Sequence, residues 1–262
     1  NLNMSFPWED HLQACIDARV HAVSLFWGVT SDAIARAAVA GVKVMVTVAS
    51  AEEALEAQSA GADVIVAQGW EAGGHVWGKV ATLALVPSVV DAVDVPVVAA
   101  GGIADGRGMA GALMLGAQGV WIGTRFLASQ EADIHPDYRE RILAASATQA
   151  EWYADLYDLA WENAPHRALG NATSELWRQS GEAAMGNRPG EEDELGQAAD
   201  GSPILRYQSC TPVSSTTGDI AAMSMWAGQG VSLVRKIQPA GEIIDDICRD
   251  ARHLLRAAGE LL

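Results

Sequence analysis

The sequence predicts an α/β fold of parallel βα units and, within that class, a (β/α)8 barrel, or TIM barrel. Between residue 20 and about residue 130, short β-branched apolar runs alternate with alanine-rich helical segments, which is the pattern of parallel βα units. The chain has 262 residues, half of them apolar, and α/β barrels near this size form one domain. Only five strands stand out in this interval, so a doubly wound sheet is the alternative.

The expected strands are the apolar runs bounded by glycine or polar residues. They are Ala22 to Trp27, Val42 to Val48, Asp63 to Ala67, Val95 to Ala100 and Gly119 to Phe126.

Capping residues mark the helices between these strands. Ser50 followed three residues later by Glu53 forms a capping box, and Asp105 can cap the helix that follows it. Glycine ends helices because it adopts the left-handed conformation at no steric cost. The expected C-terminal caps are Gly41, Gly61 and Gly116.

Past residue 130 the βα alternation stops. We therefore divide the chain into a barrel (residues 1–130) and a helical and loop region (residues 131–262) that packs on the barrel and closes with its last helix. The expected segments of this second region are helices at Pro136 to Ala147 and Gln149 to Trp161, a long polar surface loop at Gly186 to Pro203, an interrupted helix at Asp219 to Val234 and a final amphipathic helix from about Glu242 to Leu261.

The composition excludes several functional classes. A formal charge of −16 argues against nucleic acid or an anionic membrane as partner, since both require basic patches. The three cysteines lack the spacing of a zinc site or the density of a disulfide scaffold, and the six histidines do not cluster, so no metal site is expected. No apolar run reaches the roughly 20 residues of a membrane span, and no signal pattern opens the chain. We expect a cytoplasmic protein.

The segment from Gln68 to His75 is the strongest candidate for an active-site loop. It follows an apolar strand and sets an imidazole on a glycine-rich loop, at the end of the strand where α/β proteins place their chemistry. The connection is also about ten residues longer than a helix and two turns require, and the surplus, Trp70 to Ala81, contains His75. Without further information, a surface-loop histidine is the competing interpretation.

Two further strands end in glycine turns that expose backbone N–H groups, at Gly101-Gly102 and Gly123-Thr124. In barrels, the loops after strands seven and eight form the recurrent phosphate site. If these are those loops, Asp63 to Ala67 is strand six, and the chain opens around strand three without the first two strands. Arg125 and His75 are the candidate charges for an anionic ligand, although Arg125 can equally point outward because side chains alternate along a strand.

The motifs at Gln68 to His75, Val97 to Ile103 and Gly119 to Phe126 resemble those of the nitronate monooxygenase family, once called 2-nitropropane dioxygenases. The similarity extends over the whole chain and includes Phe26-Trp27-Gly28, Asp158 to Arg167, Thr216 to Asp219 and Trp226 to Gln229. The resemblance implies an FMN-containing barrel that oxidises alkyl nitronates, such as propionate 3-nitronate, with dioxygen to carbonyl compounds and nitrite. A homodimer is an open alternative to a monomer.

The resemblance also implies roles for individual residues. His75 would be catalytic, facing the substrate above the flavin ring. Independently of the resemblance, Glu71 could orient His75 or could equally be a solvated loop carboxylate. The implied FMN contacts are Asn1 (with Asn3 as second choice), Gln68, Gly73, Gly74, Gly101, Gly102, Trp121, Ile122, Gly123 and Thr124. The implied substrate pocket comprises Trp70, Trp226 and Gln229. Core packing explains these tryptophans equally well.

Two other functions remain open. FMN barrels that reduce enoyl-acyl-carrier-protein thioesters with NADH carry a similar Glu-Ala-Gly-Gly-His loop. The family's first two strands, with a glycine-rich flavin contact, have no counterpart here, so a truncated, non-catalytic paralogue is the second alternative.

Overall fold

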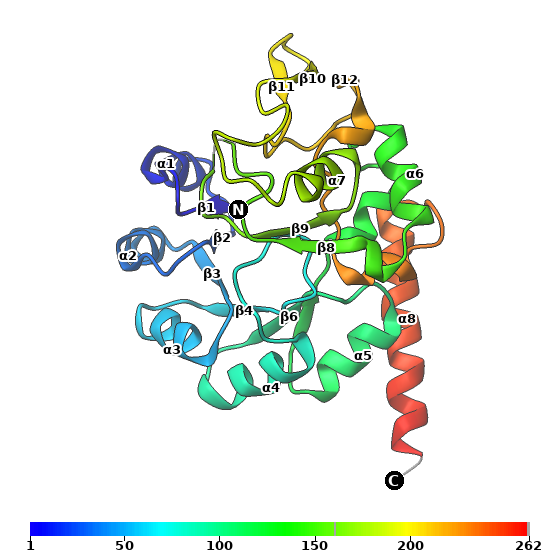
Figure 1. Cartoon of the computed structure of the whole chain (residues 1–262). Helices are drawn as coiled ribbons and strands as arrows, with labels where there is room; N and C mark the ends of the chain where they lie inside the picture. The colour runs from blue at the N-terminus through cyan, green and yellow to red at the C-terminus, as the bar shows by residue number, and fades with distance from the viewer. Residues whose placement is uncertain (160, 261–262) are drawn as a thin grey trace.

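A computed structural model describes residues 1–159 and 161–260 of the chain (Figure 1). Its central element is a parallel sheet of six strands in the order β1-β2-β3-β4-β6-β7. The strands are β1 (Leu2–Asn3), β2 (Ala22–Phe26), β3 (Lys43–Val48), β4 (Val64–Gln68), β6 (Val97–Ala100) and β7 (Gly119–Trp121). The sequential strand order confirms the barrel-type sheet. Strand β1 precedes the five strands read between residues 20 and 130, and it agrees with the expectation that the chain opens around strand three and contains strands three to eight.

Helices cover the outer face of this sheet (Figure 1). They are α1 (Glu9–Asp17), α2 (Ser31–Val39), α3 (Ala51–Ser59), α4 (Thr82–Ala92), α5 (Gly106–Met114) and α8 (Ala240–Gly259). The final helix, α8, packs along α5 and buries Ile243, Ile247 and Ala251, which confirms the expected docking helix as far as Gly259. Its expected end at Leu261 lies outside the described residues.

The helix caps predicted from the sequence are present in the structure, with one difference. Gly41, Gly61 and Gly116 have φ of +75°, +101° and +96°, and Asp105 accepts hydrogen bonds from the N–H groups of Arg107 and Gly108. Ser50 accepts from the Glu53 N–H. The Glu53 carboxylate, however, accepts from the N–H of Ala49 instead of Ser50, so only half of the capping box forms.

Two expected elements are wrong in the structure, and a third, the strand expected at 119–126, is shorter than expected. Strand β7 ends at Trp121, and the residues after it form a 3-10 helix, η1 (Thr124–Ala128). Of the expected helix at 149–161, the segment β8 (Ala150–Tyr153) is a strand instead, because it pairs with β9 (His166–Leu169). Residue 160 lies outside the described residues. The interrupted helix at 219–234 is replaced by two 3-10 turns, η3 (Ile220–Ala222) and η4 (Gln229–Leu233).

The expected surface loop at 186–203 is partly ordered into sheet. Strand β10 (Glu194–Gln197) pairs with β11 (Pro203–Leu205) and β12 (Thr217–Gly218). Nearby, α6 (Pro136–Ala144) confirms an expected helix, and α7 (Ala172–Gln179), capped by Asn171, was not expected. Helix α6 and η3 contribute to a second apolar core, separate from the core beneath the parallel sheet. The division of the chain at residue 130 stays a prediction.

A short antiparallel sheet brings the loop after β4 against the second half of the chain. Its strands are β5 (Gly74–His75), β9 and β8, with His75 opposite His166. The last two residues of the predicted active-site loop, Gly74 and His75, therefore form a strand that pairs with the second half of the chain.

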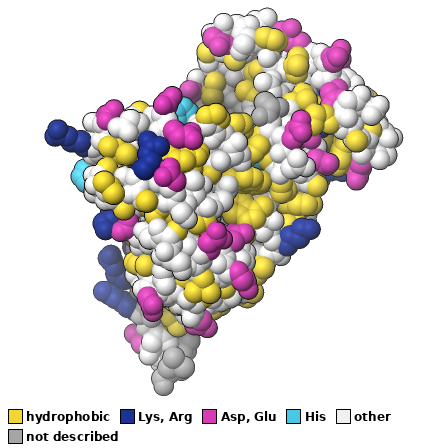
Figure 2. All heavy atoms as spheres, turned by 90° about the vertical axis from the view of Figure 1, so that its left-hand side faces the viewer, with side chains coloured by type: hydrophobic (Ala, Val, Ile, Leu, Met, Phe, Trp, Pro, Cys, Tyr) yellow, Lys and Arg dark blue, Asp and Glu magenta, His cyan; other side chains and the backbone are white. Residues whose placement is uncertain are grey.

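Figure 2 shows Asp and Glu side chains spread over the face that α1 to α3 present, as the net charge of −16 leads one to expect. No helix among the described residues is long and apolar enough to span a bilayer.

Candidate active site

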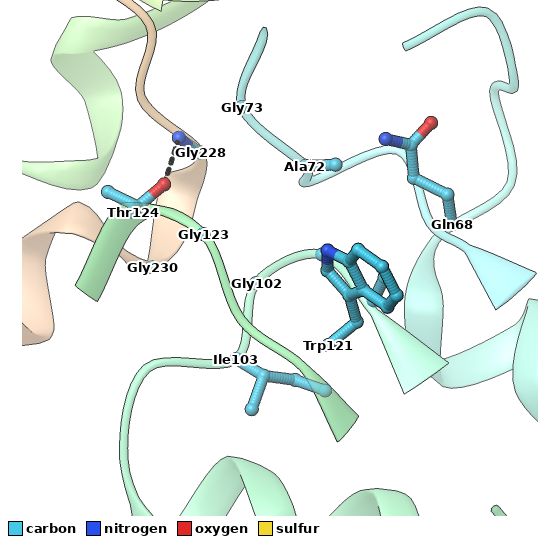
Figure 3. A pocket seen from close by; sticks show the side chains of 12 residues that line it. Gln68, Ala72, Gly73, Gly102, Ile103, Trp121, Gly123, Thr124, Gly228 and Gly230 are labelled. Atoms are coloured by element: carbon cyan, nitrogen blue, oxygen red, sulfur yellow. Dashed lines mark hydrogen bonds between the residues drawn. The ribbon is translucent and has the colours of Figure 1, made fainter. Parts of the chain in front are cut away.

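Two neighbouring cavities open at the carboxyl ends of β4, β6 and β7. The first, here the glycine cavity, is lined by Gln68, Ala72, Gly73, Ala100, Gly101, Gly102, Ile103, Trp121, Gly123, Thr124, Gly228 and Gly230 (Figure 3). The second, here the histidine cavity, is lined by Asn1, Phe26, Thr47, Val66, Gln68, Gly73, His75, Ala100 and Trp121. Four residues line both, so the cavities form one trough.

The glycine cavity is walled mainly by backbone. Gly101 and Gly102 adopt φ of +100° and +72°, a region that side-chain-bearing residues rarely enter. A Cβ at Gly123 would meet no atom within 4 Å, so the space beside this residue is open. The Thr124 hydroxyl accepts a hydrogen bond from the N–H of Gly228 at 2.9 Å (Figure 3), which leaves its own proton to donate. Such a wall suits a phosphate group.

The histidine cavity presents unpaired polar atoms. His75 Nε2 and Gln68 Oε1 are buried and have no hydrogen-bond partner among the described residues. Gln68 instead uses its amide N–H to donate to the His75 carbonyl at 3.2 Å. Because an unpaired buried polar atom is costly, these two atoms mark a place where a ligand would complete the hydrogen bonding.

His75 is uncharged at neutral pH. Burial, reinforced by the nearby His166, lowers the pKa of His75 to about 3. The neutral ring can donate or accept one hydrogen bond at Nε2, according to its tautomer. It is a weak base and cannot serve as a counter-ion.

Indole rings surround His75. The ring centroid of Trp161 lies 3.9 Å from that of His75, that of Trp226 lies at 5.1 Å, and that of Trp27 lies edge-on at 6.1 Å. Trp27 has a φ of +76°, an unfavourable conformation for a residue with a side chain and one that tends to occur at functional sites. We call Trp27, Trp161 and Trp226 the aromatic cage. It limits water around His75 and offers flat apolar surface.

The structure brings most of the predicted site residues together. Those that line the trough are Asn1, Gln68, Gly73, His75, Gly101, Gly102, Trp121, Gly123 and Thr124. Trp226 contacts His75. Gly74 lies beside Gly73 but does not line either cavity.

Other predicted residues lie elsewhere. Ile122 lines a separate apolar cavity with residues of α8, as expected for alternation along the chain after β7. Trp70 stacks on Trp152 with a centroid distance of 4.9 Å, and Gln229 contributes a backbone N–H bond to the Glu71 carbonyl. Arg125 turns away from the trough and donates to Gln238 at 2.6 Å.

The sequence interpretation missed several wall residues. Thr47 and Val66 point into the trough from β3 and β4, and Ala72 and Gly230 close the glycine cavity. Thr47 could have been found, because it is a polar residue near the carboxyl end of an expected apolar strand, Val42 to Val48. Glu71 does not hydrogen-bond to His75; its carboxylate accepts from Thr82. No group of three or more candidate metal ligands occurs among residues 1–159 and 161–260.

The comparisons with known proteins agree with this geometry. The family profile described as nitronate monooxygenase matches residues 1–250. The chain belongs to the nitronate monooxygenase family. A protein of Staphylococcus aureus named probable nitronate monooxygenase is 32% identical over 256 residues, which cover 94% of this chain and 67% of the relative.

Two further similarities are informative. A (3aS,4S,5R,7aS)-5-hydroxy-7a-methyl-1-oxo-octahydro-1H-indene-4-carboxyl-CoA dehydrogenase of Rhodococcus jostii is 50% identical over 113 residues, 43% of this chain and 32% of that protein. The solved structure of FabK from Thermotoga maritima superposes with a TM-score of 0.80 at 33% identity, covering all of this chain and 78% of that one. The chain is thus a member of a family of flavin-dependent oxidoreductases and has a TIM-barrel fold. It spans about two thirds of the length of the Staphylococcus aureus relative.

The residues of the trough fit a flavin mononucleotide. The glycine cavity offers backbone donors and the Thr124 hydroxyl for a phosphate. The adjoining histidine cavity offers two unpaired polar atoms and the Trp121 ring for a flat heterocycle.

Proposed function

We propose that this protein uses FMN to oxidise alkyl nitronates with dioxygen, giving a carbonyl compound and nitrite. The observation that supports this most is the continuity of the trough. A backbone-walled cavity suited to a phosphate opens directly into a cavity where His75 presents an unpaired Nε2.

Each end of the trough would have a separate task. Gly101, Gly102, Gly123 and Thr124 would hold the phosphate, and Gln68, Gly73, Trp121 and Asn1 would position the ring. When bound, FMN would supply the electron transfer between substrate and dioxygen. The protein provides binding, orientation and a site poor in water.

His75 would orient the substrate. A nitronate is already a carbanion equivalent and needs no proton removed before it is oxidised. A neutral imidazole with hydrogen on Nε2 can donate one hydrogen bond to a nitronate oxygen, in surroundings where such a bond is strong. Because its pKa is lowered to about 3, His75 is poorly suited to deprotonate a neutral nitroalkane. The site should therefore prefer nitronates to the parent nitroalkanes.

The main alternative is oxidoreduction of an acyl thioester, including NADH-dependent reduction of an enoyl thioester. One observation favours it: the 50% identity to the Rhodococcus jostii protein, whose name denotes a dehydrogenase of a carboxyl-CoA substrate. The aromatic cage would accommodate an apolar acyl chain as readily as an alkyl nitronate. A non-catalytic paralogue is the third alternative.

Three assays on the FMN-loaded protein separate these alternatives. Oxygen uptake and nitrite release with propyl-1-nitronate and propionate 3-nitronate test the proposal. NADH oxidation dependent on a crotonyl thioester tests enoyl reduction, and reduction of a dye by a saturated acyl-CoA tests dehydrogenation. Thioester turnover without nitrite release would overturn the proposal, and tight FMN binding with no turnover in any assay would favour the non-catalytic paralogue.

A further inference from the structure

Glu71 occupies an unusual place between the loops that form the glycine cavity. It belongs to the loop after β4, and its carboxylate Oε2 accepts hydrogen bonds from the Thr82 N–H at 2.8 Å and the Thr82 hydroxyl at 2.9 Å. Thr82 is the first residue of α4, and the N-cap position before it is Ala81, which has no capping side chain. Glu71 therefore caps α4 from eleven residues upstream and places a negative charge at the helix N-terminus, where it is favourable.

Thr82 connects this cap to the glycine turn. Its hydroxyl has one proton and lies within hydrogen-bonding distance of two acceptors, Glu71 Oε2 at 2.9 Å and the carbonyl oxygen of Gly101 at 3.0 Å, so it donates to one of them at a time. The Thr82 N–H bond to Glu71 keeps the buried side chain in place beside Gly101. A Cβ added at Gly102 would lie 3.2 Å from Glu71 Cβ, so the glutamate stem also packs against the turn. The Gly101-Gly102 turn is thus supported by Glu71 directly and through Thr82.

The same residue also contacts the far wall of the cavity. The Glu71 carbonyl accepts a hydrogen bond from the Gln229 N–H at 2.9 Å, next to Gly228 and Gly230 of the cavity lining. Three segments distant in sequence therefore meet at Glu71.

Arg167 balances the charge of Glu71. The carboxylate of Glu71 raises the pKa of this buried guanidinium, although burial lowers it more strongly. Arg167 is itself fixed by donating to the carbonyls of Trp70 at 2.8 Å and Ala150 at 2.9 Å. A carboxylate near a phosphate site would ordinarily repel the ligand. Here the Oε2 atom accepts hydrogen bonds from Thr82, and Arg167 is a cation close enough to attract the carboxylate without forming a direct ion pair.

We propose that Glu71 is a positioning residue for the phosphate of the cofactor: through Thr82 it holds the Gly101-Gly102 turn in the arrangement that receives that group. This rests on the proposed binding of FMN with its phosphate in the glycine cavity. It does not depend on which substrate is oxidised.

The test compares FMN with riboflavin, which has the same ring and ribityl chain but no phosphate. Both dissociation constants are measured by flavin fluorescence quenching on the refolded or deflavinated protein. In Glu71→Ala, we expect FMN to bind about tenfold more weakly, because the cap and the support of the turn are lost, and riboflavin to bind within about twofold of wild type. Thr82→Val should weaken FMN binding about threefold, and Thr82→Ser should restore it.

Asp63→Asn is the matched control. Asp63 also accepts from one backbone N–H, that of Val44 at 2.9 Å, and from one side chain, that of Lys43, but it lies at the opposite end of β4. This variant should leave the ratio of the two dissociation constants unchanged.

Each outcome decides the proposal. If Glu71→Ala and Thr82→Val weaken FMN and riboflavin equally, their role is merely structural and the proposal is overturned. It is overturned also if FMN binds unchanged, or if wild-type protein binds FMN no better than riboflavin. If Glu71→Ala does not fold, the Thr82→Val and Thr82→Ser pair gives the same decision. A selective loss of FMN binding without nitronate turnover would uphold Glu71 while rejecting nitronate oxidation.

Discussion

The two ends of the trough are built in different ways. At the glycine cavity the wall is backbone, shaped by turns at Gly101-Gly102 and Gly123 that directly follow strands. At the histidine cavity the functional environment is made of side chains, with Trp27, Trp161 and Trp226 brought around His75 from distant parts of the chain. Backbone geometry can be specified by a few neighbouring residues, whereas an aromatic cage requires the completed fold.

This comparison predicts that the two ends can be disabled independently. The largest effect is expected for Gly123→Leu, whose side chain would occupy open space beside the glycine cavity without steric conflict at Cβ. FMN affinity should fall about 300-fold, because the leucine side chain would cost about two charge-assisted hydrogen bonds between the backbone and the phosphate. The melting temperature of the apoprotein should stay within a few degrees of wild type. The checks are fluorescence titration and thermal unfolding. Gly111→Ala also meets open space but lies on the outer helix α5; it should leave FMN affinity unchanged and raise the melting temperature by a few degrees at most, because alanine favours a helix over glycine.

The opposite end is tested by His75→Ala. Loss of the hydrogen bond from His75 to the substrate should lower kcat/KM for propyl-1-nitronate about 100-fold. This value lies at the lower end of the range for catalytic side chains, because no proton must be removed from a nitronate. FMN affinity should change less than about threefold. Steady-state oxygen uptake and FMN titration measure the two effects. Equal losses in both would show that the ends are not separable.

The charge of the substrate gives a smaller effect. None of the nine residues that line the histidine cavity has an acidic or strongly basic side chain, and His75 is neutral at pH 7. A carboxylate on the substrate therefore has no counter-ion there, and propyl-1-nitronate should exceed propionate 3-nitronate in kcat/KM by about fivefold, roughly 1 kcal/mol. The measurement is competition at fixed ionic strength. A preference for the carboxylated nitronate would require a cation near the cavity.

The last expected effect is on the pH dependence of stability, which concerns the buried histidines and not the binding of cofactor or substrate. The pKa of His75 is lowered to about 3 and that of His166 to about 4, both mainly by burial. A histidine with a lowered folded pKa stays neutral in the folded state, while the unfolded chain binds a proton below about pH 6.5. The contribution of these histidines to the free energy of unfolding is therefore fully present above pH 6.5 and decreases towards pH 4. Each histidine lowers the free energy of unfolding by at most about 1.4 kcal/mol for each pH unit.

Urea unfolding of wild type and His75→Gln at pH 7.0, 5.5 and 4.5 measures this linkage. The variant should lose stability less steeply than wild type as the pH falls. Parallel curves would mean that His75 is protonated in the folded state. The nitronate kcat/KM should also be flat from pH 5.5 to 8.5, since His75 does not titrate there.

The regular half of the molecule followed closely from the sequence, but much of the second half did not. Glycine caps and apolar runs predicted β2, β3, β4 and β6 to within two residues at each end, because those signals are local. Residues 150–153 were predicted as helix and form β8, because pairing with β9 outweighs their helical propensity. The same limit applies to Glu71, whose partner Thr82 was apparent only in three dimensions.

The sequence by itself determined the family, the parallel sheet and most of the residues that line the trough, among them His75, Gln68 and the glycines at 101, 102 and 123. These follow from short motifs in which a turn, a strand end and a side chain are adjacent along the chain. Only the tertiary structure decided the charge state of His75, the cage around it and the link from Glu71 through Thr82 to Gly101. The physical reason is that burial and hydrogen-bond partnership are properties of surroundings assembled from distant segments, which no local pattern encodes.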